Sequence, residues 1–190
     1  MARETPKRKK RSPLFLLLLV ALALGVFGYA RFLEPNLLLV KEAAITSSRI
    51  NGTADGLRIL VFADTHFGPH YTVSDFQKVV DAAAAAEPDI VFFLGDLIDH
   101  FHRYDAPGGT DAIAEQLAAI PARYGKYAVF GNHDYGGGAE SVYPAVMEAG
   151  GFTLLVNQTV FLPELDLTIT GIDDVVIGYG DPTAAAAASG

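Results

Sequence analysis

Cysteine and tryptophan are absent from this sequence, and basic residues are scarce after its first eleven positions. Without cysteine the chain cannot form a disulfide, a thiolate zinc site, an iron–sulfur cluster or a cysteine nucleophile. Any metal ion must therefore be held by histidine, aspartate, glutamate, asparagine or backbone oxygen. The length of 190 residues and the 51% of hydrophobic residues fit a folded domain rather than a disordered segment.

Positive charge is concentrated at the N-terminus. Residues 1–11 hold six of the 14 lysines and arginines and one glutamate, so the remaining residues carry eight basic and 21 acidic side chains, a formal charge of −13. A body with this charge repels phosphate backbones, and no nucleic-acid partner is expected. Nothing in the sequence identifies a protein partner.

An uncharged apolar run extends from Leu14 to Ala30, between the basic cluster and Arg31. It predicts a basic cytoplasmic tail over residues 1–12 and a transmembrane signal-anchor helix over 13–33, because about 17–25 apolar residues span a bilayer. The excess of lysine and arginine before the run predicts a single-pass protein of the cell membrane with its N-terminus cytoplasmic and its domain outside. The alternative is a signal peptide that is cleaved near Ala30, which would release the exported domain.

The rest of the chain has the pattern of an α/β domain. Residues 34–56 are expected to form a connector with an edge strand near Leu38–Ile45, and residues 57–190 to form the domain. Short apolar runs alternate there with capped helices, which is typical of right-handed βαβ units and a parallel sheet. The predicted strands are 57–64, 89–96, 126–132, 152–156 and a hairpin of 159–162 and 166–170, and the predicted helices are 73–86, one from Thr110 or Asp111 to Pro121, and 139–149.

Short polar motifs follow the first three predicted strands: DTH at 64–66, GDLID at 95–99 and GNHD at 131–134. The carboxyl ends of parallel strands meet at one edge of a sheet, so these motifs are expected to lie together. Asp64 and His66 are two positions apart, and in extended chain both side chains would face one side. Each motif alone could be a turn or a helix cap, but the three together favour a metal site. Oxygen and imidazole ligands suit Mn, Fe or Zn.

These three motifs, in this order and at these strand ends, resemble the calcineurin-like metallophosphoesterase family over Leu57 to Asp174. With the apolar segment before them, they are most similar to the bacterial membrane-associated branch of that family. The resemblance implies a four-layer α-β-β-α sandwich. It also implies hydrolysis of a phosphomonoester or phosphodiester by a hydroxide that bridges two divalent metal ions. The membrane segment favours a lipid-like or envelope substrate.

The resemblance implies a role for each polar residue of the motifs. Asp64 and His66 would bind the first metal ion, Asp96 would bridge both ions, and Asn132 would bind the second. The two catalytic candidates are His133, which would face the scissile ester, and Asp99, which would form a hydrogen bond with it. Supporting residues or residues of the substrate mouth would be Asp134, His100 and His102.

The sequence departs from the family pattern after His133. The site of the family also takes a lone histidine and two histidines of a terminal GHxH motif, whereas no histidine follows His133 here. Part of the ligand set and much of the second sheet are therefore missing, and one face of the sheet is expected to be partly bare. The sequence accordingly reads as a C-terminally truncated form of a membrane-tethered phosphoesterase.

Two functional hypotheses follow from this departure. In the first, the full-length parent is a dinuclear-metal phosphoesterase, and the 190-residue chain alone is weakly active or inactive. In the second, the chain is a catalytically incomplete fragment or a membrane-tethered binding protein without enzymatic activity on the same fold.

Overall fold

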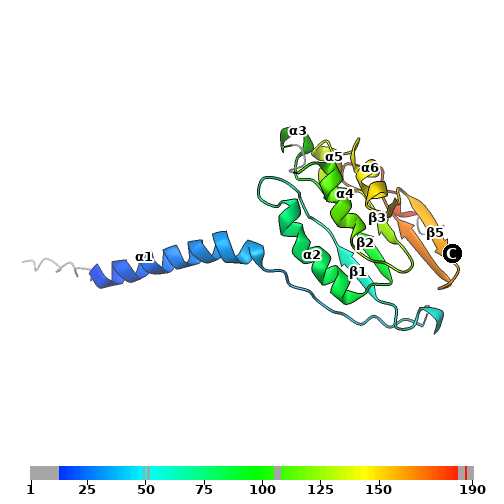
Figure 1. The fold of residues 1–190 in the computed structure, drawn as a ribbon, viewed down its shortest axis with the longest axis horizontal. Helices are drawn as coiled ribbons and strands as arrows, with labels where there is room; N and C mark the ends of the chain where they lie inside the picture. The colour runs from blue at the N-terminus through cyan, green and yellow to red at the C-terminus, as the bar shows by residue number, and fades with distance from the viewer. Residues whose placement is uncertain (1–12, 49, 51, 105–107, 184–186, 188–190) are drawn as a thin grey trace, which may run out of the picture. The chain divides into compact units, whose positions relative to one another are not determined.

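The chain divides into two compact units, Met1–Leu39 and Val40–Gly190. The computed structural model describes residues 13–48, 50, 52–104, 108–183 and 187 (Figure 1). The predicted basic tail over 1–12 lies outside the described residues.

The first unit is a helix that extends from Pro13 to Asn36. It consists of α1 (Pro13–Gly28), a π-helical turn η1 (Tyr29–Leu33) and a 3-10 turn η2 (Glu34–Asn36). No residue of these three elements is buried. By length and composition the helix could cross a membrane.

The segment after this helix is extended but is not a strand. Residues 37–47 belong to no helix or strand, so the edge strand expected near Leu38–Ile45 is wrong. A strand is stable only when its backbone groups pair with a neighbour, and among the described residues no strand pairs with this segment. Its apolar side chains are exposed. The connector then enters a 3-10 turn, η3 (Gly52–Ala54), where the Thr53 hydroxyl donates to the carbonyl oxygen of Leu165.

The second unit contains a parallel four-stranded sheet in the order β1-β2-β3-β4, which confirms the predicted α/β class (Figure 1). Because the strands follow each other in chain order, right-handed connections place the intervening helices on one face of the sheet. Each strand lies within a predicted strand. The strands are β1 (Ile59–Phe62), β2 (Ile90–Phe93), β3 (Lys126–Ala128) and β4 (Phe152–Leu154), and the longer helices between them are α2 (Val73–Ala86), α4 (Thr110–Ala118) and α6 (Tyr143–Ala149).

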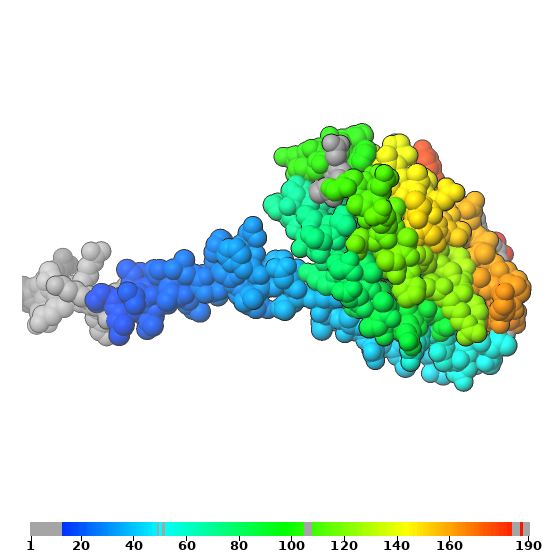
Figure 2. Space-filling model, viewed as in Figure 1, coloured from blue at the N-terminus to red at the C-terminus, as the bar shows by residue number. Residues whose placement is uncertain are grey.

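The three helices bury one face of the sheet, and α2 and α4 lie side by side (Figure 1). In Figure 2 their atoms form the adjoining green surfaces of the domain. The N-terminus of α2 is formed by a capping box, in which the Thr72 amide donates to the Asp75 carboxylate at 2.8 Å. Alternate strand residues point into this core, as the period of two requires. Its fully buried members include Phe76, Val91, Phe93, Ile113, Leu117 and Met147.

An antiparallel hairpin of β5 (Gln158–Leu162) and β6 (Leu167–Gly171) packs on the opposite face, as predicted. It buries Tyr127 and Leu155 at the β3–β4 side of the sheet. On the β1–β2 side, Ile59, Val61 and Leu94 stay about half exposed. The second sheet is thus a two-stranded hairpin in the described chain, and the opposite face is partly bare as expected.

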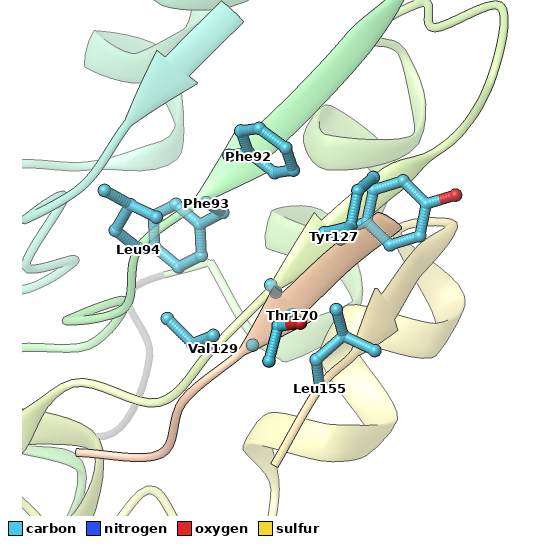
Figure 3. Close-up of a pocket in the computed structure, with 10 residues that line it drawn as sticks. Phe92, Phe93, Leu94, Tyr127, Val129, Leu155 and Thr170 are labelled. Atoms are coloured by element: carbon cyan, nitrogen blue, oxygen red, sulfur yellow. The ribbon is translucent and has the colours of Figure 1, made fainter. Parts of the chain in front are cut away.

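An apolar hollow of about 170 Å³ lies between the sheet and the hairpin (Figure 3). Phe92 of β2, Tyr127 of β3 and Thr170 of β6 are among the residues that line it. None of its lining residues belongs to the three polar motifs. The hollow is therefore separate from the predicted metal site.

Candidate metal centre

The loops that carry the first two motifs run side by side at the carboxyl edge of the sheet. The amide of Asp64 donates to the carbonyl of Gly95 at 3.1 Å, and the amide of His66 donates to the carbonyl of Asp96 at 3.0 Å. A third bond, from Phe67 to the carbonyl of Leu97 at 2.8 Å, continues this pairing. Backbone hydrogen bonds thus extend the contact between β1 and β2 beyond the strands themselves.

Three of the predicted metal ligands have left-handed backbone conformations. The φ angles are 55° at Asp64, 43° at His66 and 60° at Asp96. This region is rare for residues other than glycine and costs about 1–3 kcal/mol at each position. The expectation that Asp64 and His66 lie in extended chain is therefore wrong, because β1 already ends at Phe62. Among the described residues, six residues other than glycine have a positive φ, and three of them are these predicted ligands at one edge of the sheet. Such a concentration of strained backbone is typical of a functional site.

This conformation brings the first two motifs into contact through their side chains. His66 Nε2 lies 3.6 Å from Asp64 Oδ1 and 3.7 Å from Asp96 Oδ2. The His66 ring also contacts the His133 ring edge to face, with ring centroids 4.7 Å apart. One ligand atom from each of His66, Asp96 and His133 lies within 4.8 Å of the others. The sequence motifs therefore meet in space.

The donor set fits a divalent cation. The imidazole nitrogen of His66 lies near a carboxylate oxygen of Asp64 and one of Asp96, and this mixture of ligand atoms suits Mn, Fe or Zn. Asp64 is not part of the compact group of His66, Asp96 and His133. His66 Nδ1 is buried and has no hydrogen-bond partner in the described chain. This is unusual, because a buried polar atom without a partner costs free energy of folding. Asn132 is the first residue of helix α5 (Asn132–Gly136) and directly precedes His133. The sequence did not predict this short helix, since it placed a strand up to residue 132.

The third motif is joined to the second by Asp134, which is fully buried. Its carboxylate accepts hydrogen bonds from the amides of Asp96 at 2.8 Å, Leu97 at 3.0 Å and Gly131 at 2.9 Å. Burial raises the pKa of Asp134 to about 6, although the three amides oppose this rise. Because no part of Asp134 faces solvent, it supports the loops and does not line a substrate mouth.

Two glycines let these loops approach at backbone distance. Gly95 has a φ of 90°, and a Cβ atom there would overlap the backbone nitrogen of Gly131. A Cβ atom on Gly131 would in turn overlap the carboxylate of Asp96. The motifs therefore need glycine at both positions because no space exists for a side chain.

His133 is held by two hydrogen bonds. Its backbone amide donates to Asp96 Oδ1 at 2.8 Å, and its ring Nδ1 lies 3.1 Å from the backbone carbonyl oxygen of Asp99. A carbonyl oxygen can only accept, so Nδ1 donates this hydrogen bond, and Nε2 is the ring nitrogen that remains available for another partner. His133 thus contacts the backbone carbonyl oxygen of Asp99. The side chain of Asp99 was the expected partner.

The two histidines that follow Asp99 lie beside the C-terminal end of α5. His102 belongs to a short helix, α3 (Phe101–Tyr104), and its amide donates to the carbonyl of Gly137 at 3.3 Å. The His102 ring fills the space where a Cβ on Gly138 would lie. Both His100 and His102 are exposed. Their expected place near a substrate mouth remains a prediction.

Tyr135 connects α5 to the C-terminal part of the domain, a contact that the sequence did not predict. Its hydroxyl donates to the carboxylate of Asp173, at 2.9 Å from Oδ1, and Asp173 is buried. Asp173 belongs to the string GIDD at 171–174, and this string equally suits an ordinary turn. A buried acceptor opposite a tyrosine 38 positions away cannot be read from a local pattern.

These features define an α/β protein with a candidate metal centre at the carboxyl edge of a parallel sheet. The chain belongs to the calcineurin-like phosphoesterase family, whose model matches residues 57–184. The family expected from the three motifs is thereby confirmed.

Several curated proteins of this family are similar to the chain. The uncharacterized metallophosphoesterase YkuE of Bacillus subtilis is 36% identical over 160 residues, which cover 83% of this chain and 55% of YkuE. A transmembrane protein with a metallophosphoesterase domain from Danio rerio is 28% identical, covering 84% of this chain and 36% of its own length. The UDP-2,3-diacylglucosamine pyrophosphatase LpxG of Chlamydia trachomatis is 32% identical, covering 56% and 31%. The chain thus spans about half the length, or less, of these relatives.

Proposed function

We propose that this chain carries the metal- and phosphate-binding edge of a membrane-tethered phosphoesterase that acts outside the cytoplasm. The observation that supports the proposal most directly is the convergence of His66, Asp96 and His133, from three separate loops, with ligand atoms within 4.8 Å of one another. The membership of a phosphoesterase family adds the reaction class. The apolar helix from Pro13 to Asn36 adds the membrane anchor.

In this proposal two divalent ions are held by side chains of the three motifs. Asp64 and His66 would hold one ion, Asp96 would serve both, and Asn132 would contribute to holding the second. Bound ions of this kind neutralise phosphate oxygens and make a hydroxide nucleophile available near neutral pH. His133 has a matching role, because its protonated Nδ1 is engaged by the Asp99 carbonyl and its Nε2 is left to meet the ester.

The proposed substrate is a phosphoester with a lipid-like or envelope-derived part. LpxG is named for hydrolysis of a diacylated sugar nucleotide, and another relative is named as a transmembrane protein. The helix α1 would keep this domain next to a membrane, where amphiphilic substrates collect. We propose no choice between a phosphomonoester and a phosphodiester.

The test measures metal binding and hydrolysis in the same preparations. The full chain in lipid nanodiscs is titrated with Mn²⁺ and then assayed with an aryl phosphate and an aryl phosphodiester. We expect Asp96→Asn to weaken Mn²⁺ binding by about 10–100-fold. His133→Asn should lower the hydrolysis rate by at least about 100-fold. Glu115→Gln removes an exposed carboxylate from α4 and serves as the control.

The outcomes separate the enzyme from its alternatives. Metal binding that depends on Asp96 together with hydrolysis that depends on His133 supports the enzyme. Metal binding without hydrolysis indicates a catalytically incomplete fragment, in line with the absence of histidine after His133. If Mn²⁺ does not bind, the tethered binding protein is the better description.

A further inference from the structure

Residues 173–181 form an ordered loop beyond the hairpin. The carboxylate of Asp174 accepts hydrogen bonds from the amides of Val176 at 3.0 Å, Ile177 at 2.6 Å and Gly178 at 3.1 Å. This arrangement closes the loop on itself. Hydrogen bonds between backbone amides and the Asp174 carboxylate therefore set the conformation of the loop. Burial of its apolar side chains does not.

The same loop is attached to the rest of the domain by Asp173 and Asn157. Asp173 accepts a hydrogen bond from the amide of Tyr179 at 2.9 Å in addition to the one from Tyr135. The Asn157 side chain donates to the carbonyl of Tyr179 at 2.7 Å and accepts from the amide of Asp181 at 3.1 Å. Both ends of the loop are thus held in place.

This ordered loop presents apolar side chains to solvent. Val175 is 67% exposed, Val176 is 76% exposed and Tyr179 is 86% exposed, and Ile177 between them is also exposed. Single exposed apolar residues are common, but four within five positions form a contiguous patch. We call residues 175–179 the apolar loop. Because hydrogen bonds hold its backbone, the patch cannot easily fold inward to escape water.

The apolar loop lies against the helix that carries His133. Tyr135, which bonds to Asp173, is two residues after His133 in α5. A Cβ atom on Gly136 would lie 3.2 Å from Ile177 Cδ1, so the loop contacts the last residue of that helix. One short helix therefore separates the exposed apolar patch from the candidate metal centre.

We propose that the apolar loop binds the hydrocarbon part of an amphiphilic phosphoester whose phosphate lies at the candidate metal centre. This inference rests on the proposed function for the position of the phosphate. It goes further in assigning the residues that recognise the apolar part of the substrate. The apolar loop contacts the last residue of α5, and His133 is the second residue of this helix. This proximity suits a molecule in which phosphate and hydrocarbon are joined directly.

The charge of the surroundings favours a single hydrocarbon chain over a bilayer surface. Asp173, Asp174 and Asp181 flank the apolar loop, and the chain after residue 11 has a formal charge of −13. Such a surface is repelled by an array of anionic lipid headgroups, whereas a single phosphoester brings one anionic group, which the metal ions of the proposed function would neutralise. The patch consists of four side chains, which suits one hydrocarbon chain better than a membrane or a protein partner.

The test compares the binding of hexyl phosphate with that of ethyl phosphate. Both ligands are titrated calorimetrically into the Mn²⁺-loaded full chain in nanodiscs, and the signal of empty nanodiscs is subtracted. We expect hexyl phosphate to bind about tenfold more tightly, because its additional methylenes leave water. The double variant Val175→Ser with Val176→Ser should reduce this ratio to about threefold or less. Phe161→Ser, which removes an exposed apolar side chain from β5, should keep the wild-type ratio.

The result that would overturn the inference is a ratio that does not change in the double variant, or one that falls equally in Phe161→Ser. A second measurement follows binding of the full chain in nanodiscs to uncharged vesicles. If the double variant loses vesicle binding but keeps the ligand ratio, the loop contacts a bilayer and the inference is wrong. If no phosphoester is hydrolysed but the ratio depends on Val175 and Val176, the proposed activity fails and the assigned binding loop stands.

Discussion

Two buried aspartates hold the polar loops of this domain, and they do so with different partners. Asp134 accepts hydrogen bonds only from backbone amides, those of Asp96, Leu97 and Gly131. Asp173 accepts hydrogen bonds from the hydroxyl of Tyr135 and from one loop amide. Both are almost completely removed from solvent.

The comparison shows how one short helix is positioned from two sides. Asp134 and Tyr135 are neighbours in α5, so the helix is tied through one to the loops of the candidate metal centre and through the other to the apolar loop. Neither aspartate belongs to the proposed ligand set. The difference in partners predicts that loss of Asp134 disrupts the metal centre, whereas loss of Asp173 mainly releases the apolar loop.

The largest effect is expected for Asp134→Ala. Three buried amides would lose their acceptor, and a cavity would remain, so the free energy of unfolding should fall by about 3–5 kcal/mol. Mn²⁺ affinity should fall by about 10–100-fold, because Asp96 would no longer be held in its left-handed conformation. Urea unfolding and Mn²⁺ titration measure the two effects. Metal affinity that stays at the wild-type value would show that Asp134 does not position the centre.

Gly95→Ala tests the same side of the comparison without removing a polar group. A methyl group there would overlap the backbone of Gly131, at a φ of 90°, and we expect a loss of about 2–4 kcal/mol in the free energy of unfolding. Gly108→Ala is the matched control, since Gly108 has a φ of 91° but its Cβ would meet only side chains at ordinary contact distance, Val73 at 3.5 Å and Ala112 at 3.9 Å. An equal loss of unfolding free energy in both variants would show that the positive φ alone causes the effect. The close approach of the loops would then not contribute.

Asp173→Asn tests the other side of the comparison. The amide keeps one acceptor oxygen, so the unfolding free energy should fall by only about 1–2 kcal/mol. Hydrogen exchange of the amides of Val176, Ile177 and Tyr179 should become faster, because the loop would lose its attachment. Mn²⁺ affinity should change by less than about threefold. A loss of metal affinity as large as that in Asp134→Ala would abolish the distinction between the two aspartates.

The smallest effect is expected for Tyr135→Phe, which removes only the hydroxyl that donates to Asp173. The loss of one hydrogen bond should lower the unfolding free energy by about 1 kcal/mol. Combined with Asp173→Asn, it should add little, since both changes remove the same interaction. Thermal unfolding of the two single variants and the double variant measures this coupling, and fully additive losses would contradict it.

Much of the fold could be predicted because it depends on local patterns. The predicted bounds of α2, 73–86, are those of the structure, and the predicted hairpin of 159–162 and 166–170 is present as β5 and β6. The strand expected near Leu38–Ile45 was wrong because its apolar residues have no strand beside them. The predicted helix over 139–149 begins only at Tyr143, because residues 140–142 form a turn.

The sequence by itself determined the class of the domain and the three motifs at its carboxyl edge. Periodicity and caps involve residues a few positions apart, so neighbours along the chain are enough to predict them. The tertiary structure alone decided that Asp64, His66 and Asp96 are left-handed, that His133 Nδ1 meets a carbonyl, and that Asp134 and Asp173 are buried. The bonds of Asp134 with Asp96 and Leu97 and the bond of Tyr135 with Asp173 join residues 37 or 38 positions apart. Such contacts form only when the sheet brings the loops together.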